Sequence, residues 1–321
     1  MPEPLVQIRN LSKNFKTPDG LVQAVSDVSF DMEKGSITGL VGESGSGKTT
    51  LGRTLLRLIE PSGGQTLFDG EDINAMSPAE LRAMRRRMQI IFQDPVSSLN
   101  PRLRVHAIIA EGLVAHGIGT KNEHRDKVAA LLEEVGLKAD HMDRFPHEFS
   151  GGQRQRIGIA RALALEPEFI VADESVSALD VSIQAQVLNL LLDLREKRNL
   201  TMLFIAHDLS VVEYLCDQTV VMYLGKVVEK GASGELYEHA SHPYTRALLS
   251  AIPVPDPEIT QSRQILRGDI PSPLNPPSGC VFRTRCPLAE QQCETGLPDP
   301  VQISPSHSSY CKRIEALHGS I

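Results

Sequence analysis

Apolar and polar residues alternate along the chain in a pattern that predicts strands first and helices later. The stretches "LVQIRNLSKNF" (5–15) and "LVQAVSDVSFDM" (21–32) alternate with a period of two, the second more clearly, which predicts two strands. The dipeptide Asp19-Gly20 between them is a hairpin turn signal. Further along, four short apolar runs predict buried strands. They are "SITGLVG" (36–42), "QIIFQ" (89–93), "FIVADE" (169–174) and "TMLFIAH" (201–207).

Helical patterns occupy most of the chain between these runs. We expect a helix from about Lys48 to Leu58, mostly helical structure from about 104 to 150, and an amphipathic helix at 180–199. The segment "SPAELRAMRRRM" opens like a capped helix. Its capping residues are Ser77, Pro78 and Glu80. Two further strand pairs are expected at 63–73 and 218–231. Because apolar strands alternate with helices, the predicted fold class is α/β with a mostly parallel sheet.

Composition divides the 321-residue chain near residue 250. The stretches "SAIPVPDPEITQ" (250–261) and "GDIPSPLNPPSGC" (268–280) are far denser in proline than the chain before them. We therefore predict a large domain at 5–250 and a small extension at 251–321 that is rich in proline and cysteine.

The charge balance argues against a general nucleic-acid-binding protein. Such a protein needs a basic face, whereas the net charge here is −7. The short basic cluster at 82–87 is interpreted as a solvated helix face. No apolar run reaches the roughly 18 residues that span a bilayer, and the N-terminus "MPEPLVQIRN" has no apolar core of a signal peptide. We therefore expect the chain to stay in the cytoplasm.

The first chemical motif is a phosphate loop. Residues 42–49 match G-x-x-x-x-G-K-[ST], a loop between a strand and a helix whose backbone N–H groups surround phosphates. The dipole of the following helix favours an anion at its start. Lys48 is expected to reach the β- and γ-phosphates, and Thr49 to hold Mg²⁺. The residues expected to contact ATP here are Gly42, Ser44, Gly45, Gly47, Lys48, Thr49 and Thr50.

Two later segments supply further groups for the same chemistry. The run "FIVADE" ends in Asp173, a candidate Mg²⁺ ligand, and Glu174, a candidate general base for the attacking water. Upstream of this run, a glycine pair opens a helix and could bind a second phosphate, although alone it would be interpreted as a turn. Its residues are Ser150, Gly151, Gly152 and Gln153.

The order of these motifs resembles that of ATP-binding-cassette (ABC) ATPases. The chain has, in sequence, the phosphate loop, Gln93, the Ser-Gly-Gly-Gln signature, the Asp-Glu pair, "SALD" (177–180) and His207. The resemblance covers about residues 5 to 240. It implies a P-loop ATPase with a mixed sheet core, an antiparallel β subdomain and a helical subdomain that carries the signature.

The resemblance also implies roles for individual residues. Two cassettes pair head to tail, so the signature, Ser150 to Gln153, acts on the ATP held by the partner. His207 contacts the γ-phosphate and orients the water with Glu174. Gln93 senses Mg²⁺ or water and relays to the permease. Phe15 lies where an aromatic ring stacks on adenine, and Asp180, at the end of "SALD", is a further nucleotide-site residue.

Two positions depart from the usual family pattern. The signature begins with Phe149 in place of Leu, a change of one apolar residue for another. After the acid pair, Ser175-Val176 replaces Pro-Thr. Because both acids are intact, we still expect ATP hydrolysis.

The C-terminal region narrows the family further. The segments "HPYTRALL" (242–249), "GDIPSPLNPPSGC" and "CVFRTRCPLAEQQC" (280–293) resemble ATPase subunits of bacterial oligopeptide, dipeptide and nickel importers. The implied function is ATP hydrolysis that powers peptide import at the cytoplasmic face of the inner membrane. The implied partners are an identical or sister ATPase, two permease subunits and an extracytoplasmic binding protein. The alternatives are import of nickel, glutathione or a similar solute, and a soluble ABC ATPase acting on DNA or ribosomes.

Four of the five cysteines lie in the last 42 residues. Their spacings, five, six and seventeen residues, differ from the close pairs of a zinc ribbon, and soft thiolates suit iron–sulfur clusters. The resemblance implies a [4Fe–4S] cluster in some members, with free thiols, zinc and disulfides as alternatives. The candidate ligands are Cys280, Cys286, Cys293 and Cys311. We expect the fifth, Cys216, to be a core residue.

Overall fold

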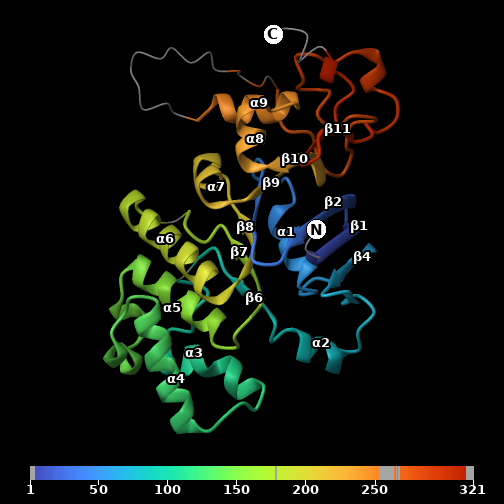
Figure 1. Ribbon diagram of the computed structural model, residues 1–321. Coiled ribbons are helices and arrows are strands. Elements are labelled where there is room, and N and C mark those ends of the chain that lie inside the picture. The colour runs from blue at the N-terminus through green and yellow to red at the C-terminus, as the bar shows by residue number, and fades with distance from the viewer. Residues whose placement is uncertain are drawn as a thin grey trace, which may run out of the picture. The chain divides into compact units, whose positions relative to one another are not determined.

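The computed structural model describes residues 4–94, 96–177, 179–252, 264, 266 and 268–315 (Figure 1). The chain forms two compact units. One, here called the helical unit, contains Glu33–Ser36 and Ala75–Ile205. The other, the phosphate-loop unit, contains Pro4–Met32, Ile37–Asn74 and the described residues from Ala206 onward. The boundary between residues 250 and 251, which was inferred from composition, stays a prediction.

The phosphate-loop unit contains an antiparallel sheet with strand order β2-β1-β4-β5. Strand β1 (Pro4–Thr17) pairs antiparallel with β4 (Gly63–Phe68), and β4 pairs antiparallel with β5 (Glu71–Asp72). Strand β2 (Gly20–Glu33) follows β1 after a two-residue turn. The period-two pattern of the first 32 residues therefore predicted both long strands correctly, and the antiparallel subdomain is confirmed.

The same unit contains a mixed sheet, with strand order β11-β12-β10-β9-β3. The wholly buried strand β3 (Ile37–Val41) lies parallel to β9 (Gln218–Tyr223). The remaining pairs are antiparallel, from β9 through β10 (Lys226–Ala232) and β12 (His307–Ser309) to β11 (Val301–Ser304). Sequence analysis did not predict β11 and β12. With these two strands the C-terminal segment, which is the described part of the chain from Ser233 onward, extends a sheet whose strand β3 lies more than 200 residues earlier.

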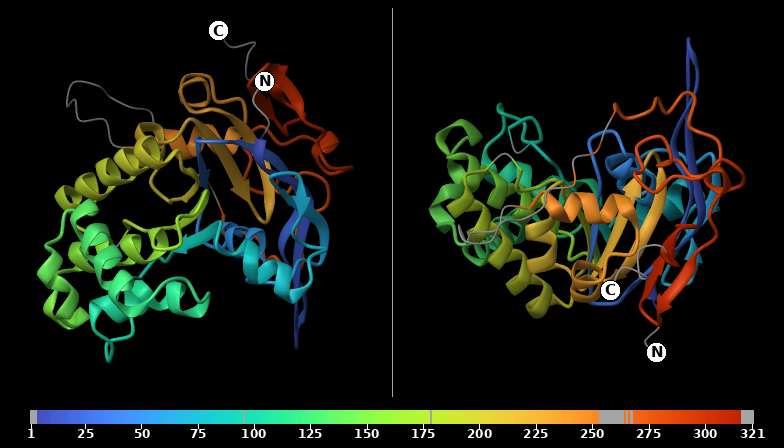
Figure 2. Two further views of the ribbon diagram at one scale, coloured as in Figure 1. Left: turned by 60° about the horizontal axis from the view of Figure 1, so that its bottom comes forward. Right: turned by 90° about the horizontal axis from the view of Figure 1, so that it is seen from above.

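The helical unit combines three parallel strands with most of the helices. The strands are ordered β8-β7-β6 and have the bounds Thr201–Ile205, Phe169–Asp173 and Met88–Ile91. Every residue of β7 and β8 is buried, as their continuous apolar runs require. The helices are α2 (Pro78–Met84), α3 (Val105–Ala115), α4 (Lys121–Glu134), η1 (Ala139–Asp143), η2 (Pro146–Glu148), α5 (Gly151–Leu163) and α6 (Val181–Arg198). The helical structure expected at 104–150 is confirmed by α3 and α4, and Figure 2 shows these two helices packed together with α5.

Helix ends confirm one prediction and correct two. The capping box of α2 forms, with Ser77 and Glu80 each bonding the other's backbone N–H. Helix α1 (Lys48–Leu55) ends before the expected Leu58, because Arg57 has a left-handed backbone with φ of 47°. The basic cluster at 82–87 does not form one solvated helix face either, because α2 ends at Met84. In addition, the Arg87 guanidinium donates to the Glu168 carboxylate at 2.5 and 3.1 Å.

The remaining helices belong to the phosphate-loop unit. They are α1, α7 (Leu209–Leu215), α8 (Ser233–Glu238), α9 (Pro243–Ser250) and η3 (Gln291–Cys293). Cys216 directly follows α7 and is buried against Gly39 of β3, as expected of a core residue. No helix among the described residues is long and apolar enough to cross a membrane.

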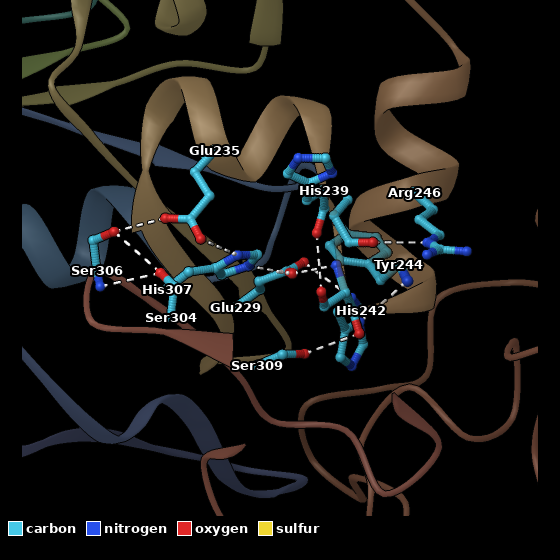
Figure 3. A network of polar contacts seen from close by, with 12 residues as sticks. Glu229, Glu235, His239, His242, Tyr244, Arg246, Ser304, Ser306, His307 and Ser309 are labelled. Carbon is cyan, nitrogen blue, oxygen red and sulfur yellow. Dashed lines mark hydrogen bonds and ion pairs between the residues drawn. The ribbon is translucent and has the colours of Figure 1, made fainter. Parts of the chain in front are cut away.

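A buried polar network anchors the C-terminal segment (Figure 3). Glu229 of β10 is fully buried, and its carboxylate accepts hydrogen bonds from the backbone N–H groups of Ser241 at 2.5 Å and His242 at 3.1 Å. A third bond, 2.9 Å, comes from Nε2 of His307 on β12, which is also fully buried. One side chain therefore joins β10, the start of α9 and β12, and its charge is dispersed over three donors.

Candidate functional site

The phosphate loop joins β3 to α1 in the phosphate-loop unit, as the sequence predicts. Gly47 is the N-cap of α1 and has φ of 101°, a left-handed conformation that glycine adopts without strain. A Cβ atom here would lie 2.1 Å from the carbonyl oxygen of Ala24, so space also requires glycine. Ser44 and Gly45 are exposed at the tip of the loop, which leaves this part accessible to a phosphate.

Lys48 lies in the first turn of α1 and is 95% buried, with 5% of its surface exposed. Its Nζ donates to the carbonyl oxygens of Gly42, at 2.8 Å, and Glu43, at 3.1 Å. The ammonium is therefore held on the carbonyl oxygens of the loop itself. Thr49 and Thr50 occupy the same first turn.

His207 belongs to the same unit and follows the end of β8 by two residues. The preceding residue, Ala206, donates its N–H to the carbonyl oxygen of Leu40, one residue before the end of β3. The phosphate loop starts directly after β3, so the exposed His207 lies at the same end of that strand. On the other side of His207, Asp208 caps α7 by accepting from Ser210 N–H at 2.9 Å.

The helical unit holds the acid pair and Gln93 at one edge of its parallel strands. Ile91 is paired with Ala172, so Gln93 and Glu174 each lie two residues beyond a register pair. Gln93 Nε2 donates to Glu174 Oε2 at 2.7 Å. Asp173 is the last residue of β7 and has only 1% of its surface exposed. The structure thus brings together two residues that are 81 positions apart in the sequence.

Glu174 stands in an unusual backbone conformation. Its φ is 43°, which is uncommon for a residue with a side chain, and its N–H donates to the carbonyl oxygen of Ile205 at 3.0 Å. The N–H and hydroxyl of Ser177 both donate to the Glu174 carbonyl oxygen, at 3.1 and 2.9 Å. Contacts on both sides therefore hold the backbone of the candidate base, and strained residues of this kind concentrate at functional sites.

The signature residues form the start of α5 in the helical unit. Ser150 is the N-cap, and its hydroxyl and the Gln153 amide form a capping box with each other's backbone N–H at 3.4 and 3.0 Å. Sequence analysis did not identify this box, although S-x-x-Q is its pattern. Gly152 permits close packing of α5 on α6, because a Cβ there would lie 2.3 Å from Cγ2 of Ile183. Gly151 is exposed at the helix start.

Phe15 and Asp180 lie at the surface of different units. Phe15 of β1 is 36% exposed, so it is no core aromatic, and Lys13 Nζ lies 4.9 Å from its ring centroid. An exposed ring in this position offers a face for stacking. Asp180 is exposed at the N-cap position of α6 and makes no side-chain cap hydrogen bond.

The four C-terminal cysteines are free thiols that influence one another electrostatically. Burial, with a smaller contribution from the neighbouring thiols, raises the pKa of Cys286 to about 11 and that of Cys311 to about 12. Among the described residues, no group of three or more His, Cys, Asp or Glu side chains is arranged to hold a metal ion. These thiols as they stand do not form a ligand set, and the iron–sulfur cluster stays a prediction.

Sequence analysis missed the contacts that hold the phosphate loop from the C-terminal segment. Tyr244 Oη accepts from the N–H of Glu43 at 2.8 Å, and the guanidinium of Arg285 bonds the Glu43 carboxylate. Tyr244 lies in the segment 242–249, which indicates only the subfamily, and no sequence motif marks Arg285 as a partner of the phosphate loop.

Two family models match the chain. Residues 25–177 match the model described as ABC transporter, and residues 228–293 match the C-terminal region of oligopeptide and dipeptide transporters. A protein named as a peptide import ATP-binding protein from Brucella ovis is 59% identical over 310 residues, covering 97% of this chain and 98% of that protein. The oligopeptide transport ATP-binding protein AppF of Bacillus subtilis is 51% identical over 319 residues, covering 96% and 97%.

Solved structures agree with these sequence comparisons. The structure of cbiO1 from Clostridium perfringens, part of the ABC transporter complex cbiONQ, has a TM-score of 0.66 at 27% identity and covers 74% of this chain and 92% of that one. The dimeric post-hydrolysis state of the ATP-binding cassette MJ0796, bound to ADP and Pi, has a TM-score of 0.65 at 28% identity, covering 71% and 98%.

Proposed function

The chain belongs to the ABC transporter family and is an ABC ATPase; from this premise we propose that it powers the import of dipeptides or oligopeptides across a bacterial cytoplasmic membrane. The observation that carries the proposal is the pair of matches on one chain. An ATPase cassette at 25–177 is followed by the C-terminal region of oligopeptide and dipeptide transporters at 228–293. Relatives named for peptide or oligopeptide transport match the chain along almost its whole length, which supports the same solute class.

The phosphate-loop unit supplies the groups that bind ATP. The backbone of Gly42 to Gly47 surrounds the phosphates, and the ammonium of Lys48 neutralises charge on the β- and γ-phosphates. The exposed ring of Phe15 stacks on the adenine. His207 contacts the γ-phosphate. These assignments are supported by the loop geometry and by the position of His207 beside the end of β3.

The helical unit supplies the groups that hydrolyse ATP. Glu174 accepts a proton from the attacking water, which then adds to the γ-phosphorus as the bond to ADP breaks. Its hydrogen bond to Gln93 supports the role, because it orients the carboxylate. Mg²⁺ would be held by Thr49, Gln93 and Asp173, whose hydroxyl, amide and carboxylate oxygens are the hard donors that it prefers, and it would neutralise phosphate charge.

The signature residues act on the ATP of a second cassette. Ser150 to Gln153 stand at the N-terminus of the 13-residue helix α5, where backbone N–H groups favour an anion. The similar cassette MJ0796 was solved as a dimer, which supports a head-to-tail pair for this chain, with an identical or sister subunit. ATP binding closes the pair and hydrolysis reopens it.

The proposal places the chain at the cytoplasmic face of the membrane. Two permease subunits convert the ATPase cycle into alternating access, and an extracytoplasmic binding protein delivers the solute. Those other chains select the solute. The alternative function is therefore import of nickel, glutathione or another peptide-like solute by an assembly of the same subunits. A soluble ABC ATPase acting on DNA or ribosomes is the minor alternative.

The iron–sulfur cluster is a separate part of the proposal. Its support is the family resemblance and the four cysteines within the last 42 residues, and the N–H of Arg313 donates to Cys311 Sγ at 3.3 Å. Purification without oxygen, followed by iron and acid-labile sulfide analysis, tests it. Four irons and four sulfides per chain would support the cluster, zinc alone would replace it, and four titratable thiols without metal would exclude it.

The transport function is tested by purification from native membranes. The variant Glu174→Gln with ATP should trap the closed assembly, and we expect two permeases, an ATPase partner and a peptide-binding protein to co-purify. The variant Lys48→Ala is the matched control, because without ATP binding the closed pair cannot form. Recovery of nucleic acid or ribosomes without membrane subunits would contradict import, and a nickel- or glutathione-binding protein would change the solute.

A further inference from the structure

Glu43, the second residue of the phosphate loop, forms an ion pair with the C-terminal segment. Arg285 Nη1 lies 2.6 Å from Glu43 Oε2, and Arg285 Nη2 lies 3.2 Å from Glu43 Oε1, so the contact is bidentate. The Arg285 side chain is 7% exposed and that of Glu43 is 26% exposed. A two-pronged pair with this burial is stronger and more directional than a surface ion pair.

The backbone of Glu43 is held as firmly as its side chain. Its N–H donates to Tyr244 Oη at 2.8 Å, and its carbonyl oxygen accepts from Lys48 Nζ at 3.1 Å. Tyr244 is fully buried, and it belongs to α9. The loop residue next to Gly42 is therefore fixed at its N–H, its carbonyl oxygen and its carboxylate, and two of the three partners come from beyond residue 240.

Arg285 is itself held in place by a buried aromatic cluster. Phe282, three residues earlier, is fully buried, and its ring centroid lies 5.2 Å from that of Tyr223 and 5.3 Å from that of Tyr244. The N–H of Arg285 donates to the carbonyl oxygen of Phe282 at 3.0 Å. Arg285 Nη1 also lies 3.5 Å from Tyr223 Oη. The guanidinium is thus preorganised before it meets Glu43, so forming the pair costs little side-chain entropy.

We propose that Arg285 and Tyr244 are positioning residues for the phosphate loop, and that Arg285 neutralises the carboxylate of Glu43 so that the loop accepts the triphosphate of ATP. The inference rests on the proposed function, because it assumes that this loop binds ATP. A carboxylate in a loop that binds a polyanion repels its ligand unless a cation compensates it. The C-terminal segment then sets the nucleotide affinity of a site to which it contributes no ligand.

The test is ATP hydrolysis and ATP binding by the purified full chain. Arg285→Ala exposes the Glu43 charge to the phosphates, and we expect KM and the Kd for ATP to rise about five- to tenfold with kcat nearly unchanged. In the double variant Glu43→Gln with Arg285→Ala that charge is absent, so KM should return to within about twofold of the wild-type value. Arg285→Lys keeps the charge but loses the second prong, and we expect an intermediate KM.

Arg283→Ala is the matched control, because Arg283 lies two residues away and bonds Ser278 within the C-terminal segment. We expect its KM to be that of the wild type. A rise in KM for Arg285→Ala that the second substitution fails to reverse, or an unchanged KM, would overturn the inference. If Arg285→Ala lowers thermal stability and kcat but leaves KM unchanged, Arg285 is only structural. If the wild type hydrolyses ATP and Lys48→Ala does not, the proposed function holds. A failed prediction for Arg285 then counts against this inference alone.

Discussion

The phosphate loop and the C-terminal segment belong to one unit but depend on different kinds of contact. The loop is built from consecutive residues, and Lys48 holds it from within by donating to the carbonyl oxygens of Gly42 and Glu43. The C-terminal segment is held by contacts over long sequence distances, such as the bond between His307 and Glu229 across 78 residues. The comparison predicts that changes in the loop remove activity, whereas changes in the segment's anchor remove stability.

The largest effect should come from the loop. Lys48→Ala removes the cation from the phosphate path, so we expect ATP hydrolysis to fall roughly a hundred- to a thousandfold. The melting temperature should stay close to the wild-type value. The exposed Lys16, replaced by Ala, is the control and should hydrolyse ATP normally. Normal hydrolysis by Lys48→Ala would remove the loop from the mechanism.

The anchor of the C-terminal segment should show the opposite profile. His307→Ala takes one of three donors from the buried Glu229 and leaves a cavity, so we expect a loss of about 3 kcal/mol in the free energy of unfolding. Chemical denaturation measures it. Ser306→Ala, at the exposed neighbour, should change the unfolding free energy by less than about 0.5 kcal/mol. Equal losses for the two variants would show that the buried network does not anchor the segment.

Acid should weaken the same anchor. Burial lowers the pKa of His242 from 6.5 to about 4 in the folded chain, although Glu229 partly offsets the shift. As the pH falls below 6.5, His242 therefore binds a proton in the unfolded chain before it does so in the folded chain. The contribution of His242 to the free energy of unfolding is complete above pH 6.5 and is lost towards pH 4. We expect this residue to account for roughly 2 kcal/mol of the stability lost between about pH 7 and 5.

Asn is a suitable replacement for His242, because it can still accept the cap bond from Tyr244 N–H but does not titrate. Urea denaturation from pH 7 to 5 should show a weaker pH dependence for His242→Asn than for the wild type. The exposed His239, replaced by Asn, is the control. An unchanged slope for His242→Asn would contradict the assignment of the acid sensitivity to this residue.

The same contrast explains how much could be predicted from sequence. Residues 42–49 were identifiable because a phosphate loop needs a strand, a loop and a helix start in immediate succession, and the Asp173-Glu174 pair because it ends a short apolar strand. The roles of Gln93 and His207 came from the family resemblance, and the bond from Gln93 to Glu174 depends on strands far apart in the chain. The pair of Glu43 and Arg285 is separated by 242 residues and follows no periodic pattern, so only the fold shows it.

The account is tested most directly at Glu174, by measuring ATP hydrolysis and ATP binding by Glu174→Gln in parallel. The amide cannot accept the proton of the attacking water, so we expect hydrolysis to fall about a hundred- to ten-thousandfold while ATP is still bound. The control Glu166→Gln changes a surface acid that pairs with Lys127, and it should hydrolyse ATP at the wild-type rate. Hydrolysis by Glu174→Gln at the wild-type rate would contradict the assignment of the general base and the mechanism built on it.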